Sequence, residues 1–431
     1  MTISQQAPDY LKTAASDSLV LLDHALPLVI VFKLSAAWYY PGFAPSDGAP
    51  GLELVNVLYL AFCLYGTVRL LFTQPLAILF AEPIYLALLL LAIGTLAFSM
   101  SFANSFGMVR TALLFFSACL FLRYRFRPAY LLALVFAILS VLLLVSLAMA
   151  IATPLGVMGG FDAGRWRGAF NQKNTLGENA GVAVLVALAL HIIHPRAQLW
   201  TALAASVSLL CLAMSGSATA LAATACAGLV FAVSQIMVWT NIRRQQSFAL
   251  LLASISLLAI GGVLTMGPVA QMLERDLTFT GRTAIWGQFL YFAEQRPWTG
   301  WGWATISTTD AMLPLIRQTL NLPYIQTPHS GYISLLVELG WFGLGLFVLW
   351  LGTTLVVACY DATIRRDAIA PVRVALVCGL ALQTAFESTS GALPSLWLFL
   401  LLASGSRVMV RWHQVDDRST ASRQVRLPSS R

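Results

Sequence analysis

Three cations suited to phosphate binding lie within one short stretch of the sequence, GRWRGAFNQKN, residues 164–174. Arg165 and Arg167 carry planar guanidinium groups that can each bind two phosphate oxygens, and Lys173 adds a point charge. Glycines at both ends of the RWR triplet let backbone N–H groups approach the same anion. The stretch therefore predicts a site for a phosphate or diphosphate group.

The residues that follow favour the same chemistry. Asn174 and Thr175 are expected to cap a helix whose positive end points at the anion. Glu178 lies one turn inside that helix, where we expect it to restrain Lys173 or one of the arginines. A structural interpretation stays open, in which the two arginines pair with Asp162 or extend towards lipid headgroups.

A fourth cation, Arg282, begins a second candidate segment, RTAIWGQFLYFAEQ, in which Ile285, Phe289 and Phe292 recur at helical spacing. This pattern predicts an amphipathic helix lying on the membrane surface, with Arg282 at the N-terminus, where helices favour anions. The tryptophans of WTGWGW, residues 298–303, surround a glycine-rich turn and are typical of an interfacial aromatic belt. A cap over the mouth of a helix bundle is the alternative role of this segment.

One histidine stands in a helix-start pattern, TPHSGYISLLVELG. Thr327 is expected to be the N-cap, Pro328 the first helical residue, and His329 part of the first turn. The positive helix end disfavours imidazolium, so the ring is expected to be neutral and able to accept a proton as a general base. Tyr332, on the same helix face, can orient the ring or contact a substrate. A capping or packing role for His329 is the structural alternative.

These residues are spread along a chain that must cross a membrane many times. Of its 431 residues, 58% are hydrophobic and 10% are charged, whereas soluble domains carry roughly a quarter charged residues. Apolar runs of about 20 residues recur, each long enough to span the hydrocarbon core. No removable signal peptide is expected. We predict an all-α polytopic membrane protein with about 12 transmembrane helices, at 19–40, 52–72, 83–101, 105–122, 129–152, 176–193, 198–214, 217–239, 248–267, 330–358, 372–388 and 392–410.

Lysines and arginines then predict the orientation. Most lie in loops that share a side with the N-terminus, and the positive-inside rule makes that side cytoplasmic. The net charge of +8 is thus mainly a topology signal, and no solvated basic domain indicates nucleic-acid binding. The predicted units are a cytoplasmic segment at 1–18, helices one to nine within 19–267 with a basic periplasmic loop at 153–175, a periplasmic loop domain with short amphipathic helices at 268–328, helices ten to twelve within 329–411, and a cytoplasmic tail at 412–431.

The absence of other motifs narrows the reaction. The segments predicted to face outward contain no zinc-protease, serine-hydrolase or P-loop motif and no close acidic pair. The six cysteines all fall in apolar segments without ligand spacing, so no metal site is predicted. Cations beside a neutral histidine favour a reaction in which a deprotonated hydroxyl attacks a phosphate-activated carbon. A lipid diphosphate would then leave while bound to the arginines.

The stretches GRWRGAFNQKNTLG, GRTAIWGQFL…RPWTGWGW and PHSGYISLLVELGWFGLG together resemble the O-antigen ligase superfamily, which also contains O-antigen and exopolysaccharide polymerases. The resemblance implies a metal-independent, inverting glycosyltransferase of the bacterial inner membrane, with no cofactor and with a glycan on undecaprenyl diphosphate as donor. It also implies that Arg165, Arg167 and Arg282 match basic positions that hold the diphosphate, and that His329 matches the histidine that activates the acceptor.

The acceptor stays open at this stage. A ligase transfers the glycan to a sugar hydroxyl of lipid A–core, whereas a polymerase transfers it to another lipid-linked repeat unit. We favour the ligase because the predicted outer domain is modest and a single histidine-centred site accounts for it. Lys173 and Asn174, however, match a KN pair seen mainly in the polymerase and exopolysaccharide branch.

An alternative of another class is a lipid-linked sugar transporter or flippase, because charges within membrane spans often mark a translocation path. No repeat relating the two halves of the chain supports it. The charged residues in or near predicted spans are Lys33, Glu82, Arg110, Glu338 and Glu387.

Overall fold

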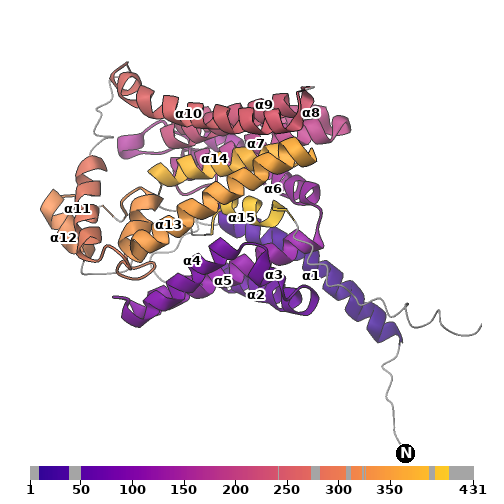
Figure 1. Ribbon diagram of the computed structural model, residues 1–431, viewed down its shortest axis with the longest axis horizontal. Coiled ribbons are helices and arrows are strands. Elements are labelled where there is room, and N and C mark those ends of the chain that lie inside the picture. The colour runs from indigo at the N-terminus through magenta and orange to yellow at the C-terminus, as the bar shows by residue number, and fades with distance from the viewer. Residues whose placement is uncertain are drawn as a thin grey trace, which may run out of the picture.

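The computed structural model is built almost entirely of helices (Figure 1). It describes residues 9–37, 50–240, 242–272, 282–306, 312–322, 325, 327–387 and 394–406, and within these ranges the side chains outside 9–17, 50–53, 161 and 260–272. The α-helices are α1 (Asp9–Ser35), α2 (Pro50–Thr73), α3 (Ala77–Phe80), α4 (Pro83–Thr95), α5 (Phe102–Arg125), α6 (Pro128–Ala152), α7 (Lys173–Ile193), α8 (Gln198–Ser215), α9 (Ala218–Trp239), α10 (Arg244–Met272), α11 (Arg282–Gln295), α12 (Met312–Leu320), α13 (Gly331–Tyr360), α14 (Ala370–Phe386) and α15 (Leu396–Ser404).

Long apolar helices dominate the bundle, as the sequence predicts. Within the described ranges, 8 helices are long and apolar enough to cross a membrane, namely α1, α2, α5, α6, α7, α8, α9 and α13, and shorter apolar helices include α4 and α14. The same ranges contain no strand, only an isolated antiparallel bridge between Val157 and Trp166. The all-α class of a polytopic membrane protein is therefore confirmed. The count of twelve spans and the outward position of the loop domain stay predictions.

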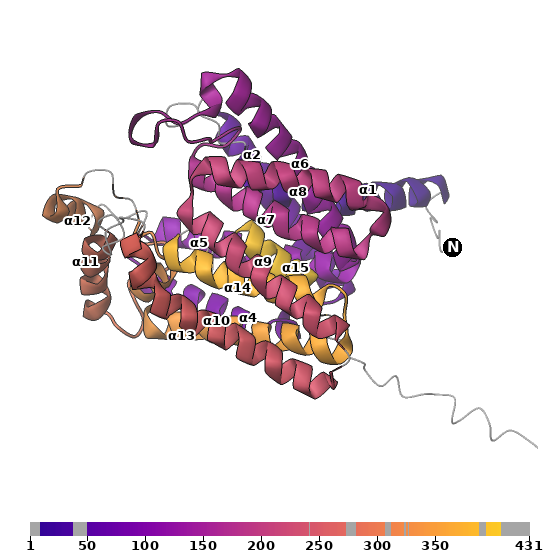
Figure 2. The same cartoon turned by 90° about the horizontal axis from the view of Figure 1, so that it is seen from above.

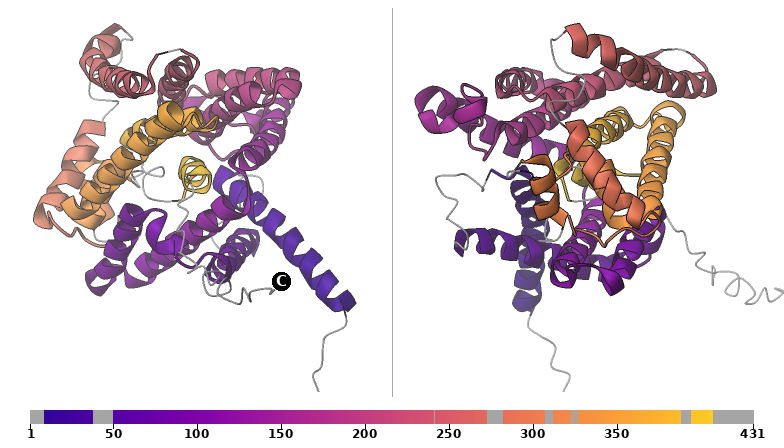
Figure 3. Two further views of the ribbon diagram at one scale, coloured as in Figure 1. Left: turned by 45° about the vertical axis from the view of Figure 1, so that its right-hand side comes forward. Right: turned by 90° about the vertical axis from the view of Figure 1, so that its left-hand side faces the viewer.

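The twelfth predicted span, 392–410, is wrong in its extent. α15 covers only Leu396–Ser404, all nine of its residues are buried, and it lies in the middle of the bundle (Figure 3, left). At about 1.5 Å per residue such a helix is too short to cross about 30 Å of hydrocarbon. Its apolar run reflects burial among other helices, because hydropathy does not distinguish a lipid environment from a protein interior.

Basic loops gather at one end of the bundle. Arg244 donates to Ile364 O at 3.0 Å and Arg366 to Val238 O at 2.8 Å, which joins the turn between α9 and α10 to the turn between α13 and α14. Arg123 at the end of α5 donates to the carbonyl of Ser406, just after α15. We call this the basic end. The shared position of these loops follows the predicted topology, and its cytoplasmic side stays a prediction.

α11 and α12 lie across the other end of the bundle, which we call the α11 end (Figures 1 and 2, and Figure 3, right). The apolar face of α11, including Ile285, Phe289 and Phe292, packs with α12 and with Val337 of α13 in a hydrophobic core separate from that of the bundle. The prediction of a helix with its apolar face in the membrane surface is therefore wrong. The aromatic belt is wrong for Trp303, which is 1% exposed.

Candidate functional site

His329 lies at the α11 end, immediately before α13. Its backbone is left-handed, with φ of 52°, and Ser330 caps the helix by accepting from Ile333 N. The expected pattern, with Thr327 as N-cap and His329 in the first turn, is therefore wrong. The Thr327 hydroxyl instead accepts from His329 N at 3.4 Å. The left-handed turn places the imidazole ahead of the helix rather than along its side, where the helix faces its neighbours.

Arg282 lies close enough to His329 to interact with it electrostatically. The two segments are also joined by Trp286 of α11, whose Nε1 donates to Pro328 O at 2.8 Å. Burial of the ring, and secondarily the positive charge of Arg282, lower the pKa of His329. The imidazole is therefore neutral at neutral pH and can accept a proton. The sequence predicted that the helix terminus keeps the ring neutral. Burial and the guanidinium of Arg282 are instead the causes of the lowered pKa.

Glu387, at the end of α14, brings a third chain segment into this cluster. From the sequence it was predicted only as a charge that could mark a transport path. Arg282 Nη1 donates to the adjacent Phe386 O at 3.0 Å, and the guanidinium interacts electrostatically with the Glu387 carboxylate. The first residue of α13, Gly331, lies against the end of α14, where an added Cβ would meet Thr384 and, at 3.4 Å, the carbonyl of Glu387. An acidic residue at the end of an apolar run was the available signal, but only the fold shows which groups it meets.

The first turns of α7 complete the cluster. Asn174 Nδ2 donates to Glu387 Oε1 at 3.3 Å. Glu178, one turn further along, lies close enough to Glu387 for the two carboxylates to interact electrostatically. Two expectations are corrected here. α7 begins at Lys173 after Gln172, without a side-chain cap, so Asn174 and Thr175 are not its cap. Glu178 makes no ion pair with any residue that the structure describes, so it restrains neither Lys173 nor an arginine.

The predicted anion loop folds as a small hairpin over the ends of α6 and α8. Met158 N donates to Arg165 O at 2.8 Å, and Gly168 packs so closely on Ser146 of α6 that a Cβ there would collide with it. The Arg165 side chain is exposed and lies over Gly216, between α8 and α9. Arg167 Nε donates to Leu155 O at 2.8 Å within the hairpin. The structural alternative has these arginines extend towards lipid headgroups, which stays a prediction, or pair with Asp162.

Asp162 instead pairs with Lys173. The Lys173 Nζ–Asp162 Oδ1 distance is 2.6 Å, and both side chains are partly exposed. Lys173 and Asn174 are consecutive, so the first turn of α7 contacts the hairpin through one residue and Glu387 through the next. The structure thus brings Arg282, Asn174 and Glu178 to Glu387, with His329 linked to this group through Arg282 and the hairpin cations linked to it through α7.

Tyr332 does not orient the imidazole. Its hydroxyl donates to Ala381 O at 3.0 Å and its ring packs on Phe347, so the side chain fixes α13 against α14. The expectation that Tyr332 positions the His329 ring is therefore wrong. These contacts hold together the two helices whose ends carry His329 and Glu387, and contact of Tyr332 with a substrate stays a prediction.

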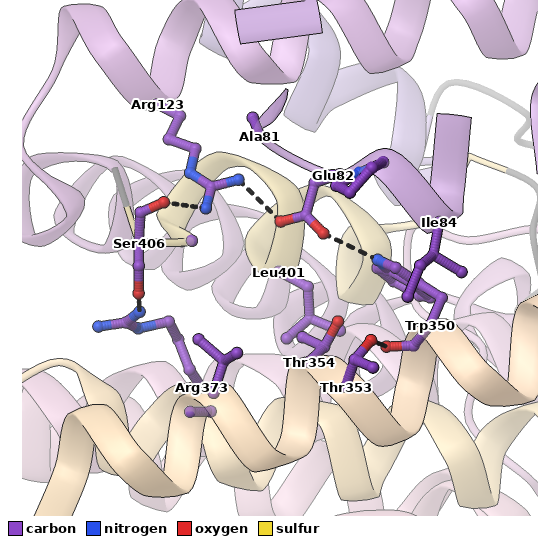
Figure 4. Close-up of a pocket in the computed structure, with 14 residues that line it drawn as sticks. Ala81, Glu82, Ile84, Arg123, Trp350, Thr353, Thr354, Arg373, Leu401 and Ser406 are labelled. Atoms are coloured by element: carbon purple, nitrogen blue, oxygen red, sulfur yellow. Dashed lines mark hydrogen bonds and ion pairs between the residues drawn. The ribbon is translucent and has the colours of Figure 1, made fainter. Parts of the chain in front are cut away.

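A cavity of about 240 Å³ lies at the basic end, between the start of α4 and the ends of α5, α13 and α15 (Figure 4). Inside it Glu82 accepts from Arg123 Nη1 at 2.8 Å and from Trp350 Nε1 at 3.0 Å. Trp350 is about 30 Å along α13 from His329, at about 1.5 Å per residue. The cavity therefore belongs to an internally paired ionic cluster and is separate from the site at the α11 end.

The geometry at the α11 end supports one kind of chemistry. A guanidinium from α11, a neutral imidazole before α13 and an amide from α7 meet at the end of α14, so an anion and a hydroxyl can be held side by side. Among the described residues no three His, Cys, Asp or Glu side chains gather closely enough to hold a metal ion. The arrangement suits binding of a phosphate-type leaving group next to a general base.

Comparison with known families gives a match for part of the chain. Residues 202–348 match the model of a family described as O-antigen ligase. The matched region runs from α8 into α13, so it contains Arg282 and His329 and excludes the hairpin with Arg165 and Arg167. No curated protein matches the chain.

Proposed function

Because the chain belongs to the O-antigen ligase superfamily, we propose that it is an inverting glycosyltransferase of the ligase type. The family covers ligases and polymerases that act on lipid-linked glycans in the membrane. In our proposal the donor is a glycan on undecaprenyl diphosphate and the acceptor is a sugar hydroxyl of lipid A–core, in lipopolysaccharide biosynthesis. The hydrogen bond from Trp286 Nε1 to Pro328 O, which ties the helix that begins at Arg282 to the segment that carries His329, is the observation that carries the proposal.

The proposed step is a single displacement. A ring nitrogen of His329 takes the proton of the acceptor hydroxyl while the hydroxyl oxygen forms a bond to the anomeric carbon of the donor sugar. The bond from that carbon to the diphosphate oxygen breaks, and undecaprenyl diphosphate leaves with the electron pair. Attack from the side opposite the leaving group inverts the anomeric centre. Proton transfer of this kind contributes roughly 10²–10⁴ in rate.

Arg282 is the residue that we assign to the leaving diphosphate. Its Nη1 donates to Phe386 O at 3.0 Å, and in our proposal the Nε–Nη2 edge of the guanidinium is open and binds two phosphate oxygens. Negative charge grows on the diphosphate as the bond breaks, and a positioned guanidinium stabilises that charge without a metal ion. Glu387 and Asn174 support this residue from α14 and α7, and Arg165, Arg167 and Lys173 supply further positive charge.

We place the enzyme in the bacterial inner membrane, with both termini cytoplasmic and the α11 end in the periplasm. This orientation follows from the arginines that gather at the basic end. Membrane lipid surrounds the bundle, and no nucleic-acid partner is proposed. The donor and the acceptor both reach the site from the membrane, so the open edge of Arg282 would face the outer headgroup level.

An O-antigen or exopolysaccharide polymerase with the same donor is the second candidate, because Lys173 and Asn174 match the KN pair of that branch. Purified protein in liposomes separates the two activities. With lipid-linked repeat units alone, a ligase forms no product, and added lipid A–core becomes glycosylated. Lengthening of the repeats without lipid A–core would refute the ligase assignment and support the polymerase.

A lipid-linked sugar transporter or flippase is the alternative of another class. Two of the charges that favoured it have structural partners, since Glu82 pairs with Arg123 and Glu338 accepts from Ile306 N at 3.4 Å. We expect His329→Ala to insert into the membrane normally and to lose nearly all glycan transfer. Full activity of that variant would contradict the proposed enzyme and favour transport.

A further inference from the structure

α13 is interrupted by another segment of the chain. Gly340 has φ of 64° and ψ of −165°, a conformation essentially restricted to glycine, so a regular helix ends there and a second one follows. In an unbroken helix Trp341 N and Phe342 N would donate to the carbonyls of Val337 and Glu338. Here the backbone of residues 297–302 pairs with both of these donors and with both of these acceptors.

The replacement is reciprocal. Trp301 N donates to Val337 O at 3.0 Å, and Gly302 N donates to Glu338 O at 2.9 Å. In return Trp341 N donates to Pro297 O at 2.7 Å, and Phe342 N donates to Trp298 O at 3.4 Å. The inserted segment therefore supplies two donors and two acceptors to the helix ladder. We call this arrangement the splice (Pro297–Gly302 with Val337–Phe342).

Two glycines make this approach possible. A Cβ on Gly300 would collide with the backbone of Glu338, and a Cβ on Gly340 would collide with the backbone of Trp298. The Glu338 side chain, 7% exposed in the core, accepts from Ile306 N at 3.4 Å just beyond the inserted segment. A buried carboxylate in an apolar helix is costly unless it is hydrogen-bonded, so its presence here indicates a specific role.

The splice joins the two segments that carry the proposed chemistry. Residues 297–302 follow directly from α11, which begins at Arg282, and the N-terminal half of α13 begins just after His329. Near the N-terminal end of α11, Trp286 Nε1 donates to Pro328 O, just before α13. The shared hydrophobic core fills the space between these two attachments. The position of Arg282 relative to His329 is therefore fixed at both ends of α11.

We propose that Gly300, Gly340 and Glu338 are positioning residues that set the separation of the diphosphate-binding guanidinium from the general base. This inference rests on the proposed glycosyltransferase function. The splice holds α11 and the first half of α13 as one body, so leaving-group binding and proton abstraction occur at a fixed spacing. A continuous α13 would release residues 297–302 and turn its N-terminal half away from α11.

Gly340→Ala tests the splice directly, because alanine favours the continuous helix and excludes the observed backbone. The matched controls are Gly345→Ala and Gly352→Ala in the same helix, where a Cβ meets no neighbouring atom. We expect Gly340→Ala to lower kcat at least about tenfold with a smaller change in donor KM, since about 1.4 kcal/mol of misplacement is tenfold in rate. The controls should retain wild-type kinetics.

The pH profile separates positioning from general damage. Of the described charged groups, Arg282 on α11 interacts with His329, Glu387 after α14 interacts with Arg282, and Glu178 of α7 interacts with Glu387. If the splice is lost, Arg282 moves away and no longer lowers the pKa of His329. The acidic limb of the activity profile then moves to higher pH. Damage without displacement would scale the whole profile and leave the limb in place.

A second pair of variants decides the matter if Gly340→Ala fails to insert. Glu338→Leu removes the acceptor of Ile306 N, whereas Glu338→Gln keeps an acceptor oxygen and should rescue most of the activity lost in Glu338→Leu. An unchanged acidic limb in Gly340→Ala, or equal activity of both Glu338 variants, would overturn the positioning role. His329→Ala, measured alongside, identifies the other failure: if it stays active, the proposed function itself is wrong.

Discussion

Replacing Arg282 separates the two effects that the structure assigns to its guanidinium. Arg282→Gln removes both the charge that lowers the pKa of His329 and the fork that can bind the diphosphate. Arg282→Lys keeps the charge and removes the fork, because an ammonium cannot bind two oxygens in a planar arrangement. The two variants should therefore differ in their pH profiles as well as in their rates.

The magnitude follows from the bonds that the open edge of Arg282 can form. Nη1 donates to Phe386 O at 3.0 Å, and the proposed phosphate contact uses two further N–H groups, on Nε and Nη2. At about 1.5–3 kcal/mol for each charge-assisted bond, Arg282→Gln should cost about 3–6 kcal/mol in the transition state. That corresponds to about 10²–10⁴ in kcat/KM. Arg282→Lys should lose about one of these bonds, or about 10–10²-fold.

Removing the charge of Arg282 should shift the acidic limb of the activity profile. His329 acts as a base only when it is neutral, so activity falls as the pH drops through its pKa. Arg282 lowers that pKa, and Arg282→Gln removes the lowering, so the acidic limb should move to higher pH. Arg282→Lys should leave the limb near its wild-type position.

The assay is glycan transfer in liposomes, with a defined lipid-diphosphate donor and a range of pH values. Arg296→Gln is the matched control, since Arg296 lies just after the same helix and its guanidinium stacks on Trp301 at 4.1 Å. It should leave the acidic limb unchanged. The reasoning is refuted if Arg282→Lys has wild-type kcat/KM, or if Arg282→Gln keeps the wild-type limb.

Three further outcomes follow from particular contacts. Glu387→Gln keeps an acceptor for Asn174 but loses the charge beside Arg282, so we expect about tenfold lower kcat/KM, or about 1.4 kcal/mol, in the same liposome assay. Gly168→Ala should reduce the free energy of unfolding by about 1–3 kcal/mol, because its Cβ collides with Ser146, and the measurement is a lower melting temperature in detergent. In the control Gly159→Ala the added Cβ meets open space, so the melting temperature should not change. Asp162→Asn leaves the Lys173 charge unpaired and should lower the donor KM by up to about fivefold, the upper range for a partly exposed pair; a raised KM would contradict this.

The sequence predicts the helices well where an apolar run faces lipid, and less well where it is buried in the protein. α13, with its long apolar run, was predicted to within two residues at its ends, at 330–358 against Gly331–Tyr360. The break inside it was not predicted, because Gly340 is a common kind of residue in a membrane helix and its inserted partner is far away in the sequence. Gly300 and Gly302 were noticed as a turn, and their function in the splice needs the tertiary contacts.

The candidate site shows the same division. Residue chemistry was enough to select Arg282 and His329 as candidates, and the structure joins their segments through Trp286 and Pro328. It could not select Glu387, because one carboxylate at the end of a span carries no sign of the three segments that meet it. It also misassigned Tyr332 and Glu178, since a helix face is not enough to determine which of several neighbours a side chain reaches. The local sequence pattern was enough to select the candidate reactive groups. The residues that support them could be found only from the packing of the folded chain.

The family match includes the guanidinium of Arg282 and leaves out the cations of the hairpin. Arg282 lies in the region that matches the O-antigen ligase family, whereas Arg165 and Arg167 lie outside it. The two groups are linked through consecutive residues, because Lys173 pairs with Asp162 of the hairpin and Asn174 donates to Glu387. A diphosphate has two charged groups. Through this link, the first turn of α7 connects the position of the hairpin to the position of Arg282. We therefore expect hairpin variants to change the donor KM chiefly and Arg282 variants to change kcat, since Arg282 interacts with the proposed base.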